Sequence, residues 1–306
     1  MKVLNGNKIL IIGASSFIGS HLVTALNEHN VTIYTANRSA NTFSDPEITH
    51  SRLDITDLSS VKKTIDKIRP DYVFNLSGYV EGGRELENIW PTFKINLEGT
   101  INLFMALQRV SFKRLIIMGS LDEHQMDLER LSPVSPYAAS KITSSAYARM
   151  FHSLYDLPVV IARPYMVYGP NQKDQNKLVP YTILSILKAE TPDFSSGTRE
   201  ADWVYISDVV DALIRCAERP NLEGKTVHVG TGKLNSVKKV VTTIFEILQV
   251  KESPKFSFIP DRKMETIISA NVEQTMQQIN WEAKVDLRSG LKATINWYQE
   301  NLGKFL

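Results

Sequence analysis

Short runs of apolar, mostly β-branched residues recur along the first half of the chain and alternate with longer stretches of helical period. Runs that are apolar throughout, rather than alternating with polar residues, are typical of parallel strands buried on both faces. The pattern predicts strands at Lys8–Ile12, Val31–Thr35, Asp71–Leu76, Arg114–Met118, Pro158–Ala162 and Thr226–Val229, and helices at Phe17–Glu28, Ser59–Ile68, Pro91–Gln108 and Tyr137–Tyr155. This order predicts an α/β fold with a doubly wound parallel sheet.

The pattern of the sequence changes after Pro170, where longer polar connections appear at Glu190–Ala201 and Lys251–Lys263. We therefore expect a smaller C-terminal α/β lobe. The segment Trp203–Gly230 has the pattern of a strand and a helix that return to the main sheet. The expected division is a first domain of residues 1–170, joined by 203–231, and a second lobe of residues 171–202 and 232–306.

The composition excludes several classes of protein. Of the 306 residues, 43% are hydrophobic, which is enough for a sizeable core. The net charge of +2 is too small for an arm that binds nucleic acid or membrane. The one cysteine, Cys216, lies in the helical-looking run Val209–Ala217, so neither a disulfide nor a cysteine metal site is expected. The apolar run Ile9–Ile12 is too short for a secretion signal, and we expect a cytoplasmic protein.

A phosphate-binding loop follows the first predicted strand. The stretch GASSFIGSHL places Gly13, Ser16 and Gly19 in a G-x-x-G-x-x-G frame between strand and helix. Glycine allows the tight turn and the close approach of a pyrophosphate to the helix N-terminus, while Ser16 can donate its hydroxyl to a phosphate. The pattern predicts a Rossmann-type dinucleotide site, with Ser15, Phe17 and Ile18 also contacting the cofactor.

The end of the second predicted strand indicates which dinucleotide is bound. An acidic residue there binds the ribose of NAD, whereas an arginine accommodates the extra phosphate of NADP. The strand exit reads YTANRSA and offers Asn37 and Arg38 but no acid. We therefore expect NADP(H) rather than NAD(H).

Three further residues form a candidate catalytic set. In SPYAASK, Tyr137 and Lys141 lie one helical turn apart, and the ammonium is expected to lower the pKa of the phenol. Ser120 follows the strand Arg114–Met118 in the stretch GSLDEH. Because parallel strands end at the same edge of a sheet, its hydroxyl is expected beside the tyrosine, within reach of a substrate carbonyl.

With these motifs in order, the sequence resembles the extended short-chain dehydrogenase/reductase family, which comprises nucleotide-sugar epimerases, dehydratases and reductases. The likeness extends over almost the whole chain. It rests on GASSFIG, LDITD, DYVFNLSG, NLEGTINLF, the serine, tyrosine and lysine above, RPYMVYGPNQ, DWVYISDVVDA and NWYQENL.

The resemblance implies roles for individual residues. Ser120 would orient the carbonyl, Tyr137 would act as general acid or base, Lys141 would hold the nicotinamide ribose, and Asp54 would contact the adenine. Further cofactor contacts are implied for Ile55, Leu76, Ser77, Gly78, Asn96, Pro164 and Val167, of which Asn96 is also expected to order its helix. Family members tend to form homodimers through a four-helix bundle of the helices that carry Asn96 and Tyr137.

The substrate residues depart from the family pattern. Met166 stands where the family usually has asparagine, and Ala201 replaces an arginine that commonly clamps the diphosphate, although Arg199 lies two positions earlier. Arg262 matches a second phosphate-binding arginine of the family, and a nucleotide-linked sugar is the expected substrate. Further substrate contacts are expected from Tyr165 and from Tyr79, Val80, Glu81 and Arg84.

The sequence leaves the reaction open. Asp122 lies two residues after Ser120, at the spacing of the acid that a sugar dehydratase requires. The leading hypothesis is an NADPH-dependent ketoreductase acting on a nucleotide-linked keto-deoxysugar, because a reductase exchanges its cofactor and NADPH is the usual cellular reductant. The alternatives are an epimerase or 4,6-dehydratase and, from another class, a non-catalytic NADP-sensing protein. Glu123 and His124 are expected at the rim of the site.

Overall fold

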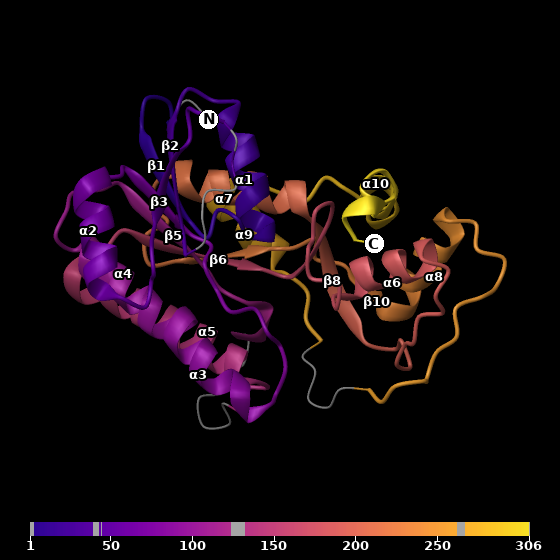
Figure 1. Ribbon diagram of the computed structural model, residues 1–306. Helices are drawn as coiled ribbons and strands as arrows, with labels where there is room; N and C mark the ends of the chain where they lie inside the picture. The colour runs from indigo at the N-terminus through magenta and orange to yellow at the C-terminus, as the bar shows by residue number, and fades with distance from the viewer. Residues whose placement is uncertain (1–2, 39–42, 44, 124–131, 262–266, 306) are drawn as a thin grey trace. The chain divides into compact units, whose positions relative to one another are not determined.

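The computed structural model describes residues 3–38, 43, 45–123, 132–261 and 267–305 (Figure 1). The chain divides into two compact units. The first comprises residues 1–164, 210–228 and 274–281, and the second comprises 165–209, 229–273 and 282–306. The expected return of 203–231 to the first unit is therefore shorter at both ends. A segment that was not expected, 274–281, joins that unit as well.

The first unit is built on a sheet whose strand order is β3-β2-β1-β4-β5-β6-β9 among the described residues. The pairs from β3 to β6 are parallel, as the apolar runs predicted. The strands are β1 (Lys8–Ile12), β2 (Thr32–Asn37), β3 (Thr49–Arg52), β4 (Tyr72–Asn75), β5 (Arg114–Met118), β6 (Val159–Pro164) and β9 (Thr226–Val229). The α/β doubly wound class is confirmed.

Helices cover both faces of this sheet, and Figure 1 shows α2, α4 and α5 on one side and α1, α7 and α9 on the other. The bounds are α1 (Phe17–Asn27), α2 (Leu58–Ile68), α3 (Ile89–Thr92), α4 (Gly99–Leu107), α5 (Pro136–Tyr155), α7 (Ile206–Glu218) and α9 (Val272–Ile279), with the short helices η1 (Leu86–Asn88) and η3 (Leu121–Glu123). A buried apolar cluster that includes Val61, Phe104, Ala148 and Ile161 fastens α2, α4 and α5 to the sheet. Burial of such side chains stabilises by about 25 cal/mol per Å² removed from water.

Two features of this unit differ from the sequence prediction. The edge strand β3 was missed because its sequence, THSR, is polar and its side chains are partly exposed, so it carries no apolar pattern. The predicted helix Pro91–Gln108 is continuous but not uniform. A π-helical segment, η2 (Phe93–Glu98), separates α3 from α4 and contains the buried Asn96.

The second unit packs three helices against a small sheet. Strands β7 (Met166–Tyr168), β8 (Glu200–Tyr205) and β10 (Leu234–Ser236) are ordered β10-β8-β7. Helices α6 (Leu178–Leu187), α8 (Val237–Ile247) and α10 (Leu287–Glu300) are followed by the short helix η5 (Leu302–Lys304). Residues such as Tyr168, Ile183, Trp203 and Ile244 form their common apolar core. The expected C-terminal lobe therefore has its own core.

The described part of the chain contains neither a membrane-spanning helix nor a cluster of metal-binding side chains. No helix there is long and apolar enough to cross a membrane. Nor do those residues contain a group of three or more His, Cys, Asp or Glu side chains that could hold a metal ion. Cys216 is fully buried, as its apolar neighbours predicted, and burial raises the pKa of its thiol to about 12.

The turn between β1 and α1 requires glycine for a steric reason. Gly13 has φ +80°, and a Cβ atom there would lie 2.5 Å from the backbone nitrogen of Ser77, just after β4. A Cβ atom at Gly19 would lie 2.3 Å from the carbonyl oxygen of Gly13. Ser16 is the N-cap of α1, where its Oγ accepts a hydrogen bond from the Gly19 N–H at 3.1 Å. A serine at the middle motif position is thus explained by capping.

We predict that Gly13→Ala destabilises the fold more than Gly6→Ala. Both glycines have positive φ, but a Cβ atom at Gly6 meets nothing within 4 Å. Gly6→Ala therefore isolates the backbone strain, about 1–2 kcal/mol, while Gly13→Ala adds a steric clash of about 1–3 kcal/mol. Urea denaturation of the two variants measures the difference, and equal losses would contradict the steric account of the turn.

Candidate active site

A cavity of about 290 Å³ lies at the carboxyl ends of β1, β2 and β4 in the first unit. The parallel strands end at this edge of the sheet, so their exit loops converge there. Its lining is formed by Ile12, Gly13, Ser15, Ser16, Ala36, Asn37, Arg38, Leu53, Asp54, Ile55, Thr56, Leu76, Ser77, Gly78 and Ile95. Ten of the residues that were expected to contact a dinucleotide are therefore brought together around one cavity. Phe17, Ile18 and Gly19 follow at the start of α1.

The end of β2 contributes a buried amide and an exposed cation to this cavity. Asn37 is buried, and its Oδ1 accepts a hydrogen bond from the Ser15 N–H at 3.3 Å. Its Nδ2 is also buried and has no hydrogen-bond partner among the described residues. The Arg38 side chain is exposed. Asp54 accepts hydrogen bonds from the backbone and hydroxyl of Thr56, at 3.0 and 2.8 Å, which orders the loop after β3.

The serine, tyrosine and lysine of the candidate catalytic set meet beyond the end of β5. Helix α5 begins with Ser135 as its N-cap and Pro136 in the first turn, and it carries Tyr137 and Lys141. Ser120 forms a side-chain hydrogen bond with Tyr137. Lys141 Nζ lies 5.8 Å from the centroid of the Tyr137 ring and donates to the Met118 carbonyl at 2.8 Å.

The protein groups alone shift the pKa of Tyr137 upward. Burial raises the pKa of the phenol, and the charges of Asp122 and Glu123 raise it further, whereas the hydrogen bond with Ser120 lowers it. The net direction is thus opposite to the lowering that was expected from Lys141 and a bound nicotinamide, and the contribution of the lysine itself stays a prediction. Burial also lowers the pKa of the Lys141 ammonium to about 8, and the charge of Glu123 opposes this shift.

The two carboxylates that follow Ser120 have different environments. Asp122 lies beside the candidate catalytic serine, because its backbone N–H donates to Ser120 Oγ at 3.2 Å and its Oδ2 lies 3.4 Å from the same hydroxyl. Glu123 is buried and pairs with Arg163, so its predicted place at the rim is wrong. The reason is that η3 turns the Glu123 side chain inward beneath Ser120. His124 lies outside the described residues.

A hydrogen-bond network connects the loop after β4 to helix α5. Asn96 Oδ1 accepts the Tyr79 N–H at 2.8 Å, and Asn96 Nδ2 donates to the Tyr79 carbonyl and to Ser140 Oγ, each at 3.1 Å. Ser140 in turn donates to the Tyr137 carbonyl at 2.7 Å. The expected ordering role of Asn96 has this physical basis.

The candidate substrate loop is partly anchored. Arg84 Nε donates to the Val134 carbonyl at 2.9 Å, and Glu81 Oε1 accepts the Gly83 N–H at 3.2 Å. Val80 is 60% exposed, so it offers an apolar surface there.

The remaining candidate substrate residues lie in the second unit. Tyr165 is buried just before β7, and Met166 and Val167 lie in β7. Met166 and Ala201 both pack at the apolar core of this unit, so the two departures from the family pattern share one apolar environment. In the register of β7 and β8, Met166 lies opposite Trp203, two residues after Ala201.

The last three predicted contact residues are Pro164, Arg199 and Arg262. Pro164, the last residue of β6, ends the first unit. Arg199 precedes β8, and its carbonyl accepts the Val237 N–H at 2.8 Å. Arg262 lies outside the described residues.

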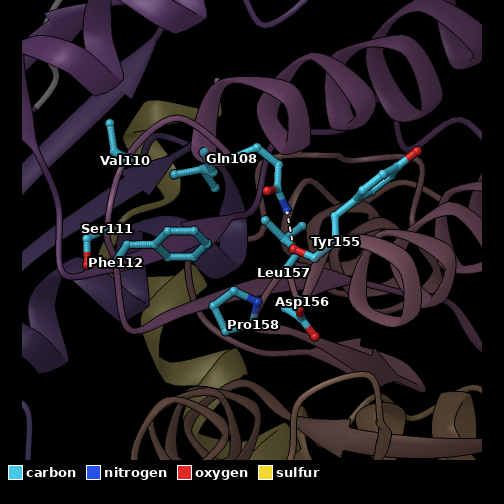
Figure 2. Close-up of a pocket in the computed structure, with 9 residues that line it drawn as sticks. Gln108, Val110, Ser111, Phe112, Tyr155, Asp156, Leu157 and Pro158 are labelled. Atoms are coloured by element: carbon cyan, nitrogen blue, oxygen red, sulfur yellow. Dashed lines mark hydrogen bonds between the residues drawn. The ribbon is translucent and has the colours of Figure 1, made fainter.

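Another pocket, of about 150 Å³, lies near the opposite ends of the strands in the first unit (Figure 2). Its lining comes from the C-terminal ends of α4 and α5 and from the loops that enter β5 and β6. Gln108 donates to the Tyr155 carbonyl at 3.1 Å across it, and Asp156 is its charged residue. None of the lining side chains belongs to the serine, tyrosine and lysine set, so we place the active site at the carboxyl edge.

Comparison with known proteins gives consistent relatives over most of the chain. The UDP-glucuronate 4-epimerase of Thermodesulfobacterium geofontis is 27% identical over 82% of this chain and 79% of its own length. The dTDP-glucose 4,6-dehydratase of an Actinoplanes species is 27% identical over 96% of this chain and 98% of its own. The enzyme WbmF of Bordetella bronchiseptica, solved in complex with NADH, superposes with a TM-score of 0.85 at 25% identity, covering 98% of this chain and 94% of that one.

The family assignment rests on a match over more than two thirds of the sequence. The family described as NAD dependent epimerase/dehydratase matches residues 9–230, which include the glycine turn, Asn96 and the serine, tyrosine and lysine set. The chain belongs to the NAD-dependent epimerase/dehydratase family, a branch of the extended short-chain dehydrogenase/reductase enzymes.

Proposed function

We propose that the protein is an NADPH-dependent ketoreductase that acts on a nucleotide-linked keto-deoxysugar. The observation that carries the proposal is the pair Asn37 and Arg38 at the cavity edge, where an NAD site presents a carboxylate. The buried Asn37 amide nitrogen has no partner among the described residues, and the Arg38 guanidinium is exposed. A guanidinium binds phosphate through charge-assisted hydrogen bonds, whereas a carboxylate repels it. NADPH is the form of the cofactor that a net reduction consumes.

The residues around the cavity fit a bound dinucleotide. Gly13 and Gly19 leave no space for a side chain where the pyrophosphate approaches, and the free N–H groups of α1 face the same place. In this proposal the first unit is the cofactor domain and the second unit is the substrate lobe. Asp54 and Ile55 would border the adenine, and Leu76, Ser77 and Gly78 the nicotinamide half. Pro164 and Val167 are further proposed contacts.

Bound NADPH supplies the hydride for the reduction. Tyr137 donates the proton to the carbonyl oxygen, because a phenol with a raised pKa is protonated at neutral pH. Ser120 orients that oxygen through its hydroxyl. Lys141 holds the ribose next to the nicotinamide, and its charge stabilises the phenolate that the proton transfer leaves.

A nucleotide diphosphate needs cationic partners, which we assign to Arg199 and Arg262 of the second unit. Tyr165, Met166 and the loop of Tyr79, Val80, Glu81 and Arg84 are the proposed contacts of the sugar. WbmF has been solved with NAD+ and UDP, and a nucleotide is consistent with the family to which this chain belongs.

A second candidate function is an epimerase or 4,6-dehydratase that uses and restores its cofactor within one turnover. The names of the relatives favour it, as does WbmF, whose reported complexes contain NAD(H). The position of Asp122, with its N–H on Ser120 Oγ, also provides an acid close to the reacting carbon.

We further propose a homodimer through α3, η2, α4 and α5. These elements expose large apolar side chains, among them Trp90 at 66%, Met105 at 45% and Leu154 at 65%. Clustered exposed apolar residues are typical of protein interfaces. A four-helix bundle between two copies would cover them.

Arg38→Ala is expected to weaken NADPH binding by about 10–100-fold, because it removes a charge-assisted hydrogen bond to the 2′-phosphate. NADH, which lacks that phosphate, is expected to bind the variant and the parent protein equally. Titration of the cofactor fluorescence measures both affinities. Arg109→Ala, an exposed arginine at the end of α4, is the control. Equal losses for both cofactors, or an NADH preference in the parent protein, would remove the NADPH assignment.

Purified protein is expected to oxidise NADPH in the presence of a 4-keto-6-deoxy sugar nucleotide, and Tyr137→Phe is expected to reduce kcat by about 10²–10⁴-fold. Asp122→Asn distinguishes the two candidate reactions, because it leaves a ketoreductase largely active and abolishes a dehydratase. Conversion of a non-keto sugar nucleotide without net NADPH loss would establish the second candidate instead. If Tyr137→Phe changed no measurable function, the non-catalytic sensor would be favoured.

Trp90→Lys and Leu154→Lys are expected to convert the protein from a dimer to a monomer, because each places a charge in an apolar interface. Light scattering after gel filtration measures the mass. Phe258→Lys is a matched control, since Phe258 is 61% exposed in the second unit. A parent protein that is monomeric at micromolar concentration would contradict the dimer.

A further inference from the structure

Glu123 is a buried charged residue beside the candidate catalytic set, and the proposed chemistry does not use it. It is 9% exposed, although it follows directly after Asp122 in a polar stretch. Its Oε1 accepts a hydrogen bond from the Ser120 N–H at 2.6 Å, and its Oε2 accepts one from Arg163 Nη2 at 2.9 Å. Both carboxylate oxygens are therefore committed, one to the candidate catalytic serine and one to a cation.

The partner cation is buried as well. Arg163 lies near the end of β6, and its side chain is 11% exposed. Its Nε is buried without a hydrogen-bond partner among the described residues. A buried ion pair that leaves a donor unsatisfied stabilises a fold poorly, because the desolvation of both charges opposes their attraction. Stability alone thus gives no reason for the pair at this position.

The contacts of Glu123 instead fix the geometry of Ser120. The Ser120 N–H binds the Glu123 carboxylate, and the Glu123 N–H donates to the Ser120 carbonyl at 3.1 Å. Both backbone polar groups of the serine, the N–H and the carbonyl, are thus hydrogen-bonded to Glu123. Its hydroxyl is left to bond Tyr137 and to accept the Asp122 N–H.

The charge of Glu123 also reaches the two other candidate catalytic groups. Among the described residues, the charged groups that face this region are Asp122 and Glu123 from η3, Lys141 from α5 and Arg163 from β6. Glu123 acts to raise the pKa of both the Tyr137 phenol and the Lys141 ammonium. For the lysine this opposes burial, which alone would keep the ammonium even less protonated at neutral pH.

We propose that Glu123 is a positioning residue: held by Arg163, it fixes the backbone of Ser120 beside Tyr137 and places a buried negative charge next to the candidate catalytic set. The catalytic roles of the three residues rest on the proposed function, but the two effects of Glu123 are properties of the protein without substrate. They can be measured even if the reaction is a different one.

The test is a pH titration of the Lys141 Nζ resonance in protein labelled with ¹⁵N-lysine, with the resonance assigned by its loss in Lys141→Arg. The parent protein is expected to titrate near pH 8. In Glu123→Gln, which keeps the shape and an acceptor for the Ser120 N–H, the midpoint is expected to fall by about 0.5–1 pH unit. Because this variant leaves Arg163 unpaired, the double variant Glu123→Gln/Arg163→Met is measured as well and is expected to show the same direction.

A second ion pair, between a buried arginine and a partly exposed glutamate, provides the control. Arg114 and Glu223 form an ion pair at the opposite end of β5, so Glu223→Gln and Glu223→Gln/Arg114→Met remove the same groups away from the site. These variants are expected to leave the Lys141 midpoint unchanged. An unchanged midpoint in both Glu123 variants, or an equal shift in the control variants, would overturn the proposal.

The kinetic readout then tests positioning. With a substrate, the basic limb of the kcat/KM profile is expected at lower pH in Glu123→Gln than in the parent protein, because Lys141 loses its charge earlier. Glu123→Leu, which removes the acceptor, is expected to have a kcat about tenfold below that of Glu123→Gln. Equal kcat values would overturn the positioning role. A parent protein that oxidises no NADPH would instead remove the proposed function and leave the titration result intact.

Discussion

The parallel order of the central strands is the constraint on which the rest of the structure depends. Parallel pairing from β3 to β6 brings the carboxyl ends of all these strands to one edge of the sheet. Residues that are far apart in sequence, such as Gly13, Asn37, Ser77 and Ser120, follow those strand ends. The apolar faces that hold the helices on the sheet therefore also determine where the polar loops meet.

The loops at this edge of the sheet are packed closely, so larger side chains would not fit there. The glycine turn after β1 touches the backbone after β4, and Asn96 connects the following loop to the helix of Tyr137. Around Ser120 the close neighbours are charged, since two carboxylates, a lysine and an arginine lie together in a region with little exposure to solvent. In such surroundings one buried carboxylate can influence the protonation of every neighbour, because low polarity strengthens each interaction. The geometry of the serine and the charge of the lysine then depend on the same side chain.

Much of the first unit is predictable because its signals are local. Strands β1, β5 and β9 were predicted to the residue, since each is an apolar run bounded by polar residues, and α5 was predicted within one residue from its helical period. The gathering of the glycine turn, Asn37 and the cavity loops follows from the topology, which the strand and helix order implies.

The rest depends on contacts between distant residues, which leave little trace in the sequence. The polar edge strand β3 is specified by its neighbour, and the return of 274–281 to the first unit has no local pattern. Glu123 was expected at the rim because its neighbours are polar, whereas its burial depends on Arg163, forty positions later. The rise that burial causes in the pKa of Tyr137 was not predicted either, because burial is set by the fold. The sequence does contain a signal that could have identified the pair of Glu123 and Arg163. It is a charged residue close to a candidate catalytic serine, together with an arginine near the end of the next strand.

The activity that we propose is a net reduction by hydride transfer from NADPH. The most direct test uses NADPH deuterated at the transferred position, a 4-keto-6-deoxy sugar nucleotide and mass spectrometry of the sugar product. Net reduction predicts one deuterium in each product molecule and one oxidised cofactor for each product formed. A product without deuterium, formed while the amount of NADPH stays constant, would contradict the claim and establish a cofactor that is restored in each turnover.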